Sequence, residues 1–344
     1  MTTDNIISQE PIIQSSKLRE NYSPQTSLEN ANNLELPLIT IVTPSYNQGQ
    51  FLAETIDSVL SPKYPKLEYI VIDGASTDSS LEVIKKYQQD IAYWVSETDR
   101  GQAHAINKGL AKAKGSIVAF LNSDDLYLPE TLLFVAKFFT ENPEVDFLCG
   151  QTQFIDRNST PTQGFSDLFD VEINELTMTE TCHIAQPSTF FRSRILESVP
   201  SFDESLHYCF DYDFWLRSFL CGYKFASTSK ILSYFRLHDQ SKTNTAYLQG
   251  KFDRDFIQIY QSNLQRKDLT KNQRQGLRRG LAIASSLLFI HLEASQSTNQ
   301  GRAQLYKIIK QEPAILLSRL IWKTLIVSLM PNVLRQTWQK IKQR

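Results

Sequence analysis

The sequence predicts an α/β fold, in which a mostly parallel, doubly wound sheet carries helices on both faces and precedes a helical C-terminal extension. Three observations support this expectation. Apolar, β-branched runs alternate with segments of helical periodicity four times between residues 38 and 140. The connections between them are short and rich in turn-forming residues. After about Tyr247, helical periodicity continues without a strand-like run.

The chain opens with a polar leader and a first strand-helix pair. Residues 1–36 are rich in Ser, Asn, Gln and Glu and lack periodicity, which predicts a flexible or surface-draped leader. Leu38–Thr43 is β-branched and apolar, as in a strand, and Pro44–Gly49 is a loop of turn formers. A helix is then expected up to about Ser61, on the spacing of Phe51, Leu52, Ile56, Val59 and Leu60.

The second strand is expected over Leu67–Asp73, and it also closes on an acidic residue. Gly74–Asp78 supplies a turn. Ser79 and Glu82 then fit a capping box for a helix through Tyr87. A third strand over residues 91–96 and a helix over residues 102–113 complete the next repeat of the alternation.

The fourth strand is the apolar run Ile117–Leu121, which ends abruptly in Asn122, Ser123, Asp124 and Asp125. Adjacent carboxylates repel each other and attract a hard cation such as Mg²⁺ or Mn²⁺, itself bound to a phosphorylated substrate. The alternative is that one of the two acids caps the next helix, expected from Pro129 to about Thr140. Ligands bind outside the carboxyl ends of strands in such sheets. Pro44–Tyr46, Asp73 and the Asp124–Asp125 pair are expected to meet there.

Beyond Val145–Gly150 the alternation loosens. Residues 151–180 read as a loop or hairpin region, and Gln186–Arg192 is strand-like. Asp211–Gly222 has the pattern of a helix with Gly222 at its C-terminal cap, and Ile231–Leu237 is a further strand that ends at His238.

The charge is divided unevenly along the chain. The net charge is −1, but residues 251–344 contain 17 Lys and Arg against 5 Asp and Glu, or +12, which leaves −13 on the first 250. An interfacial membrane helix within the apolar-rich, basic end is one reading, and a helical subdomain packed on the core is the other. The expected domains are a leader over 1–36, a main domain over 37–243 and a basic helical region over 244–344.

Composition and motifs exclude several classes. The four cysteines show no metal-like spacing and read as reduced core residues. The N-terminus lacks the pattern of a secretory signal, and no uncharged apolar run reaches about 18 residues. No G-x-G-x-x-G follows the first strand, and P-loop, H-E-x-x-H and G-x-S-x-G motifs are absent. What remains is a nucleotide-type site built from carboxylates.

The residues that carry this chemistry resemble the nucleotide-binding half of a family 2 glycosyltransferase with the GT-A fold. The similarity extends over about residues 38–243. The matching blocks are Thr43–Asn47, Val71–Asp78, Asp99–Gly109 and Leu121–Asp125, followed by Gln186–Phe190, Phe202–Leu206 and Asp211–Arg217.

The resemblance implies a set of site residues. Tyr46 and Asp73 would hold the base, Arg100 would lie near the phosphates or sugar, Asp124 would bind the ribose and Asp125 the metal, Mg²⁺ or Mn²⁺. Pro44 and Gln186 complete the expected substrate-binding residues. The family motif is often Asp-x-Asp, and its first position here is Asn122.

The family's catalytic base is the second residue of a Glu-Asp pair at a helix start, which here reads Phe210-Asp211. Asp211 would therefore take the proton of the acceptor hydroxyl in a single displacement with inversion. A helix N-cap is the competing role for Asp211, and Asp213 is the competing base. His238 matches a His-x-x-Ser-Lys segment of relatives and is a weaker candidate for contact with diphosphate or metal.

The expected function is metal-assisted, inverting transfer of a sugar from a nucleotide-diphosphate donor, UDP-linked, to a glycan or lipid-linked acceptor in cell-surface polysaccharide synthesis. The alternatives are a nucleotidyltransferase on a similar fold and a non-catalytic nucleotide-sugar-binding protein, the latter motivated by Asn122 and Phe210. A cytoplasmic protein, with peripheral contact at the inner face of the membrane through the basic C-terminal helices, is expected, and nucleic acid is not an expected partner.

Overall fold

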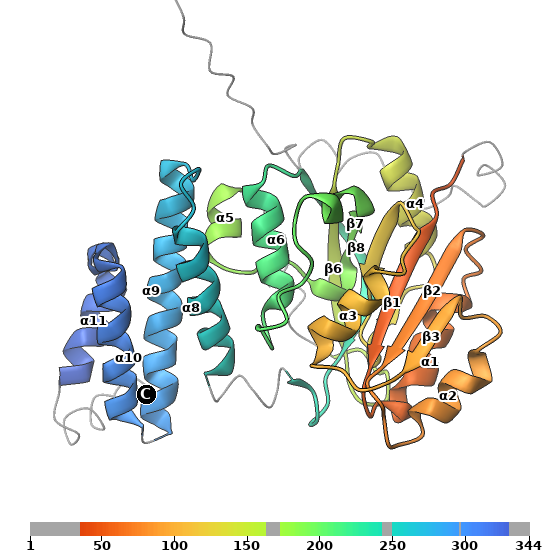
Figure 1. Ribbon diagram of the computed structural model, residues 1–344, viewed down its shortest axis with the longest axis horizontal. Helices are drawn as coiled ribbons and strands as arrows, with labels where there is room; N and C mark the ends of the chain where they lie inside the picture. The colour runs from red at the N-terminus through yellow and green to blue at the C-terminus, as the bar shows by residue number, and fades with distance from the viewer. Residues whose placement is uncertain (1–34, 163–172, 243–249, 296, 330–344) are drawn as a thin grey trace, which may run out of the picture. The chain divides into compact units, whose positions relative to one another are not determined.

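The computed structural model describes residues 35–162, 173–242, 250–295 and 297–329 (Figure 1). Nearly all of the expected leader therefore lies outside the described residues. The chain forms two compact units, of which the first contains the residues up to Asn174 and Cys182–His238. The second contains Glu175–Thr181 and the residues from Asp239 onward. The predicted boundary between 243 and 244 stays a prediction.

The first unit is built on one mixed sheet of eight strands in the order β3-β2-β1-β4-β7-β6-β8-β5. Pairing is parallel across β3, β2, β1 and β4, and again between β6 and β8. β7 is antiparallel to β4 and β6, and β5 is antiparallel to β8. The strands are β1 (Ile39–Ser45), β2 (Leu67–Asp73), β3 (Tyr93–Ser96), β4 (Ile117–Phe120), β5 (Leu126–Tyr127), β6 (Phe147–Ile155), β7 (Thr189–Arg192) and β8 (Phe225–Arg236).

The register of the parallel strands places their carboxyl ends together. Ser45, the last residue of β1, is level with Asp73 at the end of β2, and Asp73 is level with Ser96 at the end of β3. Phe120 ends β4 opposite Val42 of β1. The loops that follow β1, β2 and β4 therefore leave the sheet at one edge, as the sequence predicts.

Helices cover both faces of this sheet. Side chains alternate along β1, so Ile39 and Ile41 face one way and join a core with residues of α1 (Gly49–Leu60), α2 (Ser80–Tyr87) and α4 (Thr131–Glu141). Val42 faces the other way, toward α3 (Gln102–Leu110). A Cβ on Gly109 of α3 would lie 2.3 Å from Val42 Cγ1, so glycine is required for this close approach.

An aromatic cluster continues the core beyond the parallel strands. Phe147 of β6 stacks on Phe225 of β8 with ring centroids 4.1 Å apart. On the same face, Phe214 and Trp215 of α6 (Phe210–Leu220) pack edge-on against Phe147. The helix ends at Leu220 with Cys221 as its C-cap residue, so the cap lies one residue before the expected Gly222, whose φ of 86° suits glycine just after the cap.

Two local expectations need correction. Ser79 is the N-cap residue of α2, but its side chain accepts no capping hydrogen bond, so the predicted capping box is wrong. Asp78 takes that place, since its carboxylate accepts the N–H of Ser80 at 3.0 Å and the N–H of Gly49 at 2.9 Å. The region 151–180, read as a loop or hairpin, does contain an antiparallel bridge between Ile155 and Pro161 after the end of β6, but it also contains the helix α5 (Glu175–Glu180), which was not expected.

Among the described residues of the second unit, the regular elements are all helices. Its elements are α5, α8 (Lys251–Leu264), α9 (Lys271–Ala294), α10 (Thr298–Gln311), the 3-10 helix η6 (Pro313–Leu317) and α11 (Arg319–Leu329). α9 lies between α8 and α10, and α11 also contacts it (Figure 1). α9 begins with a true capping box, in which Thr270 Oγ1 accepts the N–H of Gln273 while the Gln273 side chain accepts the N–H of Thr270.

No helix among the described residues is both long enough and apolar enough to span a membrane.

Candidate active site

Asp124 and Asp125 lie between β4 and β5 at the carboxyl edge of the sheet. The next helix, α4, begins only at Thr131, and Glu130 is its N-cap residue. Neither aspartate therefore caps a helix, and the structural alternative for the pair is excluded. Two adjacent carboxylates lie at the point of the fold where ligands of such sheets bind.

Asp125 is held as a buried carboxylate. It is 1% exposed, and Oδ1 accepts the backbone N–H of Arg236 at 3.0 Å while Oδ2 accepts a side-chain N–H of Asn122 at 3.2 Å. Burial and the neighbouring Asp124 carboxylate raise the pKa of Asp125 well above its usual value, and these two hydrogen bonds oppose the shift. A bound cation would stabilise the negative charge that the buried Asp125 carboxylate carries when it is ionised.

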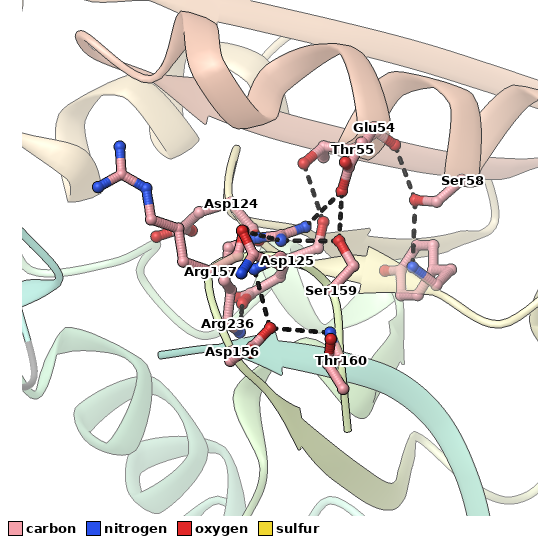
Figure 2. A network of polar contacts seen from close by, with 12 residues as sticks. Glu54, Thr55, Ser58, Asp124, Asp125, Asp156, Arg157, Ser159, Thr160 and Arg236 are labelled. Carbon is pink, nitrogen blue, oxygen red and sulfur yellow. Dashed lines mark hydrogen bonds and ion pairs between the residues drawn. The ribbon is translucent and has the colours of Figure 1, made fainter. Parts of the chain in front are cut away.

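A buried arginine fixes the backbone of the pair (Figure 2). Arg236, the last residue of β8, is 1% exposed and donates from Nε to the carbonyl of Asp124 at 2.8 Å. Its Nη2 is 2.7 Å from Glu54 Oε2 in α1, and its guanidinium lies over the Phe51 ring at 4.8 Å. Because its guanidinium binds the backbone carbonyl of Asp124, the Arg236 side chain occupies no acceptor position of either aspartate carboxylate.

The contacts of Arg236 that hold the Asp124–Asp125 loop are called the clamp below. A second residue of α1 and the turn after β6 also take part in it (Figure 2). Thr55 of α1 donates to the carbonyl of Asp125 at 2.9 Å. Arg236 Nη1 donates to the carbonyl of Arg157 and to Ser159 Oγ in the turn after β6, and Ser159 Oγ in turn donates to Glu54 at 2.7 Å. The loop is therefore positioned by α1, β8 and this turn together.

Asp124 pairs with a histidine. Its Oδ2 is 2.9 Å from His238 Nε2, and the His238 ring, 6% exposed as a residue, packs against Phe51 with ring centroids 4.8 Å apart. The Asp124 side chain remains 19% exposed. His238 thus lies beside the carboxylate pair, as its sequence position suggests.

An amide chain connects the pair to the neighbouring strands. The Asn122 side chain accepts from Gln102 Nε2 at 2.6 Å and donates to Gln186 Oε1 at 3.0 Å as well as to Asp125. Gln186 Nε2 donates to the carbonyl of Phe120 at 2.8 Å. Asn122 departs from the family motif. Both its side-chain oxygen and its side-chain nitrogen are hydrogen-bonded, to Gln102 and to Asp125 and Gln186 respectively.

The base-binding candidates lie at the adjoining ends of β1 and β2. Asp73 is fully buried, and its carboxylate accepts from the N–H and the hydroxyl of Ser76 and from Ser96 Oγ. A carboxylate offers about four acceptor positions, so one remains for a further donor. Tyr46 follows β1 and is 63% exposed, while Pro44 is buried within that strand.

Arg100 lies in the loop before α3, with a side chain that is 70% exposed. Its Nε and Nη2 both donate to Oε2 of Glu204, and Glu204 Oε1 accepts from Asn107 at 3.2 Å. These hydrogen bonds lower the pKa of Glu204 although its partial burial acts the other way. Arg100 is therefore held by a carboxylate in this structure and not by Asp124 or Asp125.

Asp211 is the second residue of α6, and Cys209 is the N-cap residue. The N-cap alternative for Asp211 is therefore excluded. The ring of the preceding Phe210 lies 6.2 Å from that of Phe120, which ends β4, so the start of α6 lies beside the carboxyl edge of the sheet. Phe210, at the position that the resemblance relates to the Glu of the family's Glu-Asp pair, is a packing residue.

Asp213, the competing base, is buried and paired. Its Oδ2 accepts from Arg217 Nε at 2.7 Å, and Arg217 also donates to the carbonyls of Pro200 and Ser201. Burial raises the pKa of Asp213, and the Arg217 guanidinium reduces this rise. Asp213 thereby joins α6 to the preceding loop, which is a structural role.

The protein alone offers an incomplete cage for a metal. In the part of the chain that the structure describes, no three His, Cys, Asp or Glu side chains are grouped so that they could hold an ion. Mg²⁺ and related ions are often held by one or two carboxylates together with substrate phosphates. The Asp124–Asp125 pair fits that donor set, and the raised pKa of Asp125 is the kind of strain that a cation removes.

The sequence matches known proteins over the same region. The model of glycosyl transferase family 2 matches residues 40–199. A glycosyltransferase of Rickettsia typhi, itself uncharacterized, is 31% identical over 225 residues, which are 62% of this chain and 68% of that protein. The chain belongs to glycosyl transferase family 2. It is a glycosyltransferase, and the resemblance read from its motifs is confirmed.

Another relative of this family 2 glycosyltransferase is better defined. It is the Escherichia coli UDP-Glc:alpha-D-GlcNAc-diphosphoundecaprenol beta-1,3-glucosyltransferase WfaP, 29% identical over 206 residues, or 59% of this chain and 78% of that protein.

Solved structures share the fold. S. aureus TarS 1-349 in complex with UDP aligns over 88% of this chain and 91% of that one with a TM-score of 0.64 at 21% identity. The mannosyltransferase PcManGT from Pyrobaculum calidifontis, in complex with GDP-Man and Mn²⁺, aligns over 86% and 87% with a TM-score of 0.58 at 19% identity. The predicted GT-A-type α/β fold is confirmed.

Sequence reasoning missed several residues of the site. Arg236 holds the backbone of the Asp124–Asp125 loop. It is the one charged residue of the expected strand Ile231–Leu237, and that is a usable sequence signal for a buried partner. Gln102 and Glu204 lie within the matching blocks but carry no local pattern that would single them out. Their contacts with Asn122 and Arg100 join segments that are far apart in the sequence.

Proposed function

We propose that this glycosyltransferase moves a sugar from a UDP-linked donor to a hydroxyl group of a glycan or lipid-linked acceptor, with inversion and with the assistance of a divalent metal ion. The observation that carries the proposal is the Asp124–Asp125 pair, held at the carboxyl edge of the sheet by Arg236. WfaP, a UDP-Glc-dependent enzyme with a diphosphoundecaprenol-linked acceptor, supports the choice of donor and acceptor class. A role in the synthesis of cell-surface polysaccharide follows from that acceptor class.

The donor would lie along the carboxyl ends of β1, β2 and β4. Tyr46 has an exposed ring that can stack on a base, and Asp73 retains one acceptor position for a base N–H. Pro44 fixes the backbone that leads into Tyr46, and Gln186 positions Asn122. Arg100 would exchange Glu204 for the donor's phosphate or sugar, since a guanidinium binds both kinds of oxygen.

Asp125 is the proposed ligand of Mg²⁺ or Mn²⁺, and Asp124 the proposed partner of the ribose hydroxyls. The metal, when bound, would stabilise the negative charge of the departing diphosphate. Arg236 and Thr55 hold the backbone of the pair, so the carboxylates need little rearrangement when the donor arrives. The Mn²⁺ complex of PcManGT supports a metal-assisted route.

Asp211 is the proposed general base. Its carboxylate would accept the proton of the acceptor hydroxyl while that oxygen forms a bond to the anomeric carbon and the bond to the diphosphate oxygen breaks. Attack from the face opposite the diphosphate inverts the anomeric centre. The ion pair with Arg217 counts against Asp213 as the base, because its carboxylate already binds a guanidinium.

The test is sugar transfer from UDP-sugars with Mn²⁺ to diphosphoundecaprenol-linked acceptors, followed by the anomeric configuration of the product. Asp211→Asn should lower kcat by at least about a hundredfold, since it removes the base and keeps the size of the side chain. Asp213→Asn should instead lower the melting temperature. A fully active Asp211→Asn enzyme, or a product with retained configuration, would refute the assignment.

We further place the enzyme at the cytoplasmic face of a membrane. Cys149, Cys182, Cys209 and Cys221 are all free thiols, which suits a reducing compartment. A lipid-linked acceptor would require access to the bilayer surface.

A further inference from the structure

We propose that the outward face of α11, together with Leu317, is a docking surface for an anionic lipid bilayer. This surface, called the α11 face below, consists of Leu317, Arg319, Trp322, Lys323, Ile326 and Leu329. The inference concerns a surface of the second unit and is independent of the donor, the metal and the catalytic residues proposed above.

α11 is anchored by its opposite side. Ile321 and Ser328 are fully buried and Thr324 is 6% exposed, a spacing that places the three on one side of a helix. This side packs in the helical unit, where α11 contacts α9 and η6. Ser318 supports the start of the helix, because its hydroxyl accepts the N–H of Leu320 at 3.3 Å. The outward face is therefore presented by a packed element.

The outward side of α11 is unusually apolar for a solvent-facing surface. Trp322 is 53% exposed, Ile326 55% and Leu329 68%, and Leu317 just before the helix is 88% exposed. Residues 322, 326 and 329 recur at helical spacing and lie opposite the buried stripe. Exposed large apolar side chains gathered on one helix face mark an interaction site, whereas scattered ones do not.

Basic side chains border this apolar strip. Arg319 and Lys323 are exposed, lie one turn apart on the same side as Ile326, and make no ion pair with another described residue. The charge continues along the chain, because residues 313–344 contain six Lys and Arg and no Asp or Glu. An apolar strip beside unpaired cations, with no acid in the segment, is complementary to the acyl boundary and head groups of an anionic bilayer.

Trp322 is also suited to the membrane interface by its polar edge. Its indole Nε1 donates to the carbonyl of Leu316 at 2.7 Å, so the indole N–H is satisfied within the protein while the ring stays exposed. A tryptophan with a satisfied N–H and a free ring loses no hydrogen bond when the ring enters the interfacial layer. α11 has 11 residues, which suits a helix that lies on the bilayer and not one that crosses it.

The experiment is flotation of the full-length protein with vesicles of phosphatidylcholine alone or with about one-third phosphatidylglycerol. We expect binding only to the anionic vesicles, loss of binding at high salt, and at least about a tenfold weaker affinity in both Trp322→Ser/Ile326→Ser and Arg319→Glu/Lys323→Glu. The matched controls are Tyr93→Ser and Lys85→Glu/Lys86→Glu in the first unit, which should bind as wild type. Melting temperatures establish that the variants fold.

Three results would overturn the proposal. One is vesicle binding that the α11-face variants leave unchanged. The second is wild-type dimerisation that these variants abolish without an effect on vesicle binding, since a second copy would then cover the face. The third is equal binding to neutral and anionic vesicles. Because the assay uses neither donor nor acceptor, its outcome is separate from that of the transfer assay.

Discussion

Asn122 stands at the first position of the segment that resembles the family's Asp-x-Asp motif, and its surroundings favour the amide. The side chain accepts from Gln102 and donates to both Asp125 and Gln186. A carboxylate cannot donate a hydrogen bond. At this position it would lie beside the Asp125 carboxylate, where Asn122 Nδ2 is now 3.2 Å from Asp125 Oδ2, and the two would repel each other. The departure from the motif therefore maintains a neutral support for a single buried anion.

Asn122→Asp should destabilise the metal-free protein by about 1–3 kcal/mol, because two donated hydrogen bonds are lost and a second anion is placed beside Asp125. Chemical denaturation without and with Mn²⁺ measures the effect, and the metal should restore part of the loss. Asn158→Asp in the exposed turn after β6 is the matched control. A variant as stable as wild type without metal would contradict the role given to Asn122.

The raised pKa of Asp125 makes a prediction about pH. Below the unfolded-state pKa the carboxyl group is neutral in both states, and its contribution to stability is fully present. As the pH rises from there through the raised pKa of the folded state, the unfolded chain ionises first, and stability is lost. The melting temperature of the metal-free wild type should therefore fall with rising pH relative to that of Asp125→Asn. Parallel curves for the two proteins would show that the carboxyl group is not strained.

At the scale of elements, the site depends on a contact between β8 and α1. Arg236 reaches Glu54, Ser159 and the Asp124 carbonyl together, and each of these comes from a different segment. The sequence assigns a strand ending at residue 237, yet it cannot show that this strand lies beside β5 and β6. Local sequence patterns predict where strands occur. The contacts of Arg236 depend on the order of the strands in the sheet, which local patterns do not predict.

Arg236→Lys should cost about 3–5 kcal/mol of stability, because lysine retains the charge but cannot reach the same set of acceptors from a buried position. Equilibrium unfolding measures the loss. The exposed Arg157, which donates to Gln50, provides the control, and Arg157→Lys should change stability by no more than about 0.5 kcal/mol. A loss of similar size in both variants would contradict the assignment of Arg236 as the clamp.

The same contrast explains how far the sequence could predict the fold. The ends of β1, β2 and β4 were predictable because each strand is an apolar run that stops at a polar loop. The carboxylate pair follows from that edge. The insertion of β7 between β4 and β6 was not predictable, since antiparallel pairing over short strands leaves no local signal. The failed capping box at Ser79 has a similar cause, because a Cβ on Gly49 would lie 2.3 Å from Ser79 Oγ and α1 therefore crowds that side chain.

At the scale of the whole molecule, the uneven charge follows the division into two units. The first 250 residues carry −13 and the remainder +12. The acidic part contains the carboxylate site, and the basic part contains the α11 face. The division does not simply follow the chain. In the sequence α5 comes between two segments of the first unit, yet it packs on α9 and belongs to the second unit. A Cβ on Gly276 of α9 would lie 1.9 Å from Thr179 Oγ1 of α5, so that contact requires glycine.

We propose that Asp125 and a divalent metal ion together bind a nucleoside diphosphate. Calorimetric titration of UDP into the full-length protein, with Mn²⁺ and with a chelator, tests it most directly. UDP binding should require Mn²⁺ and should weaken by at least about tenfold in Asp125→Ala. Binding of UDP that is equally tight without the metal, or equally tight in Asp125→Ala, would contradict it.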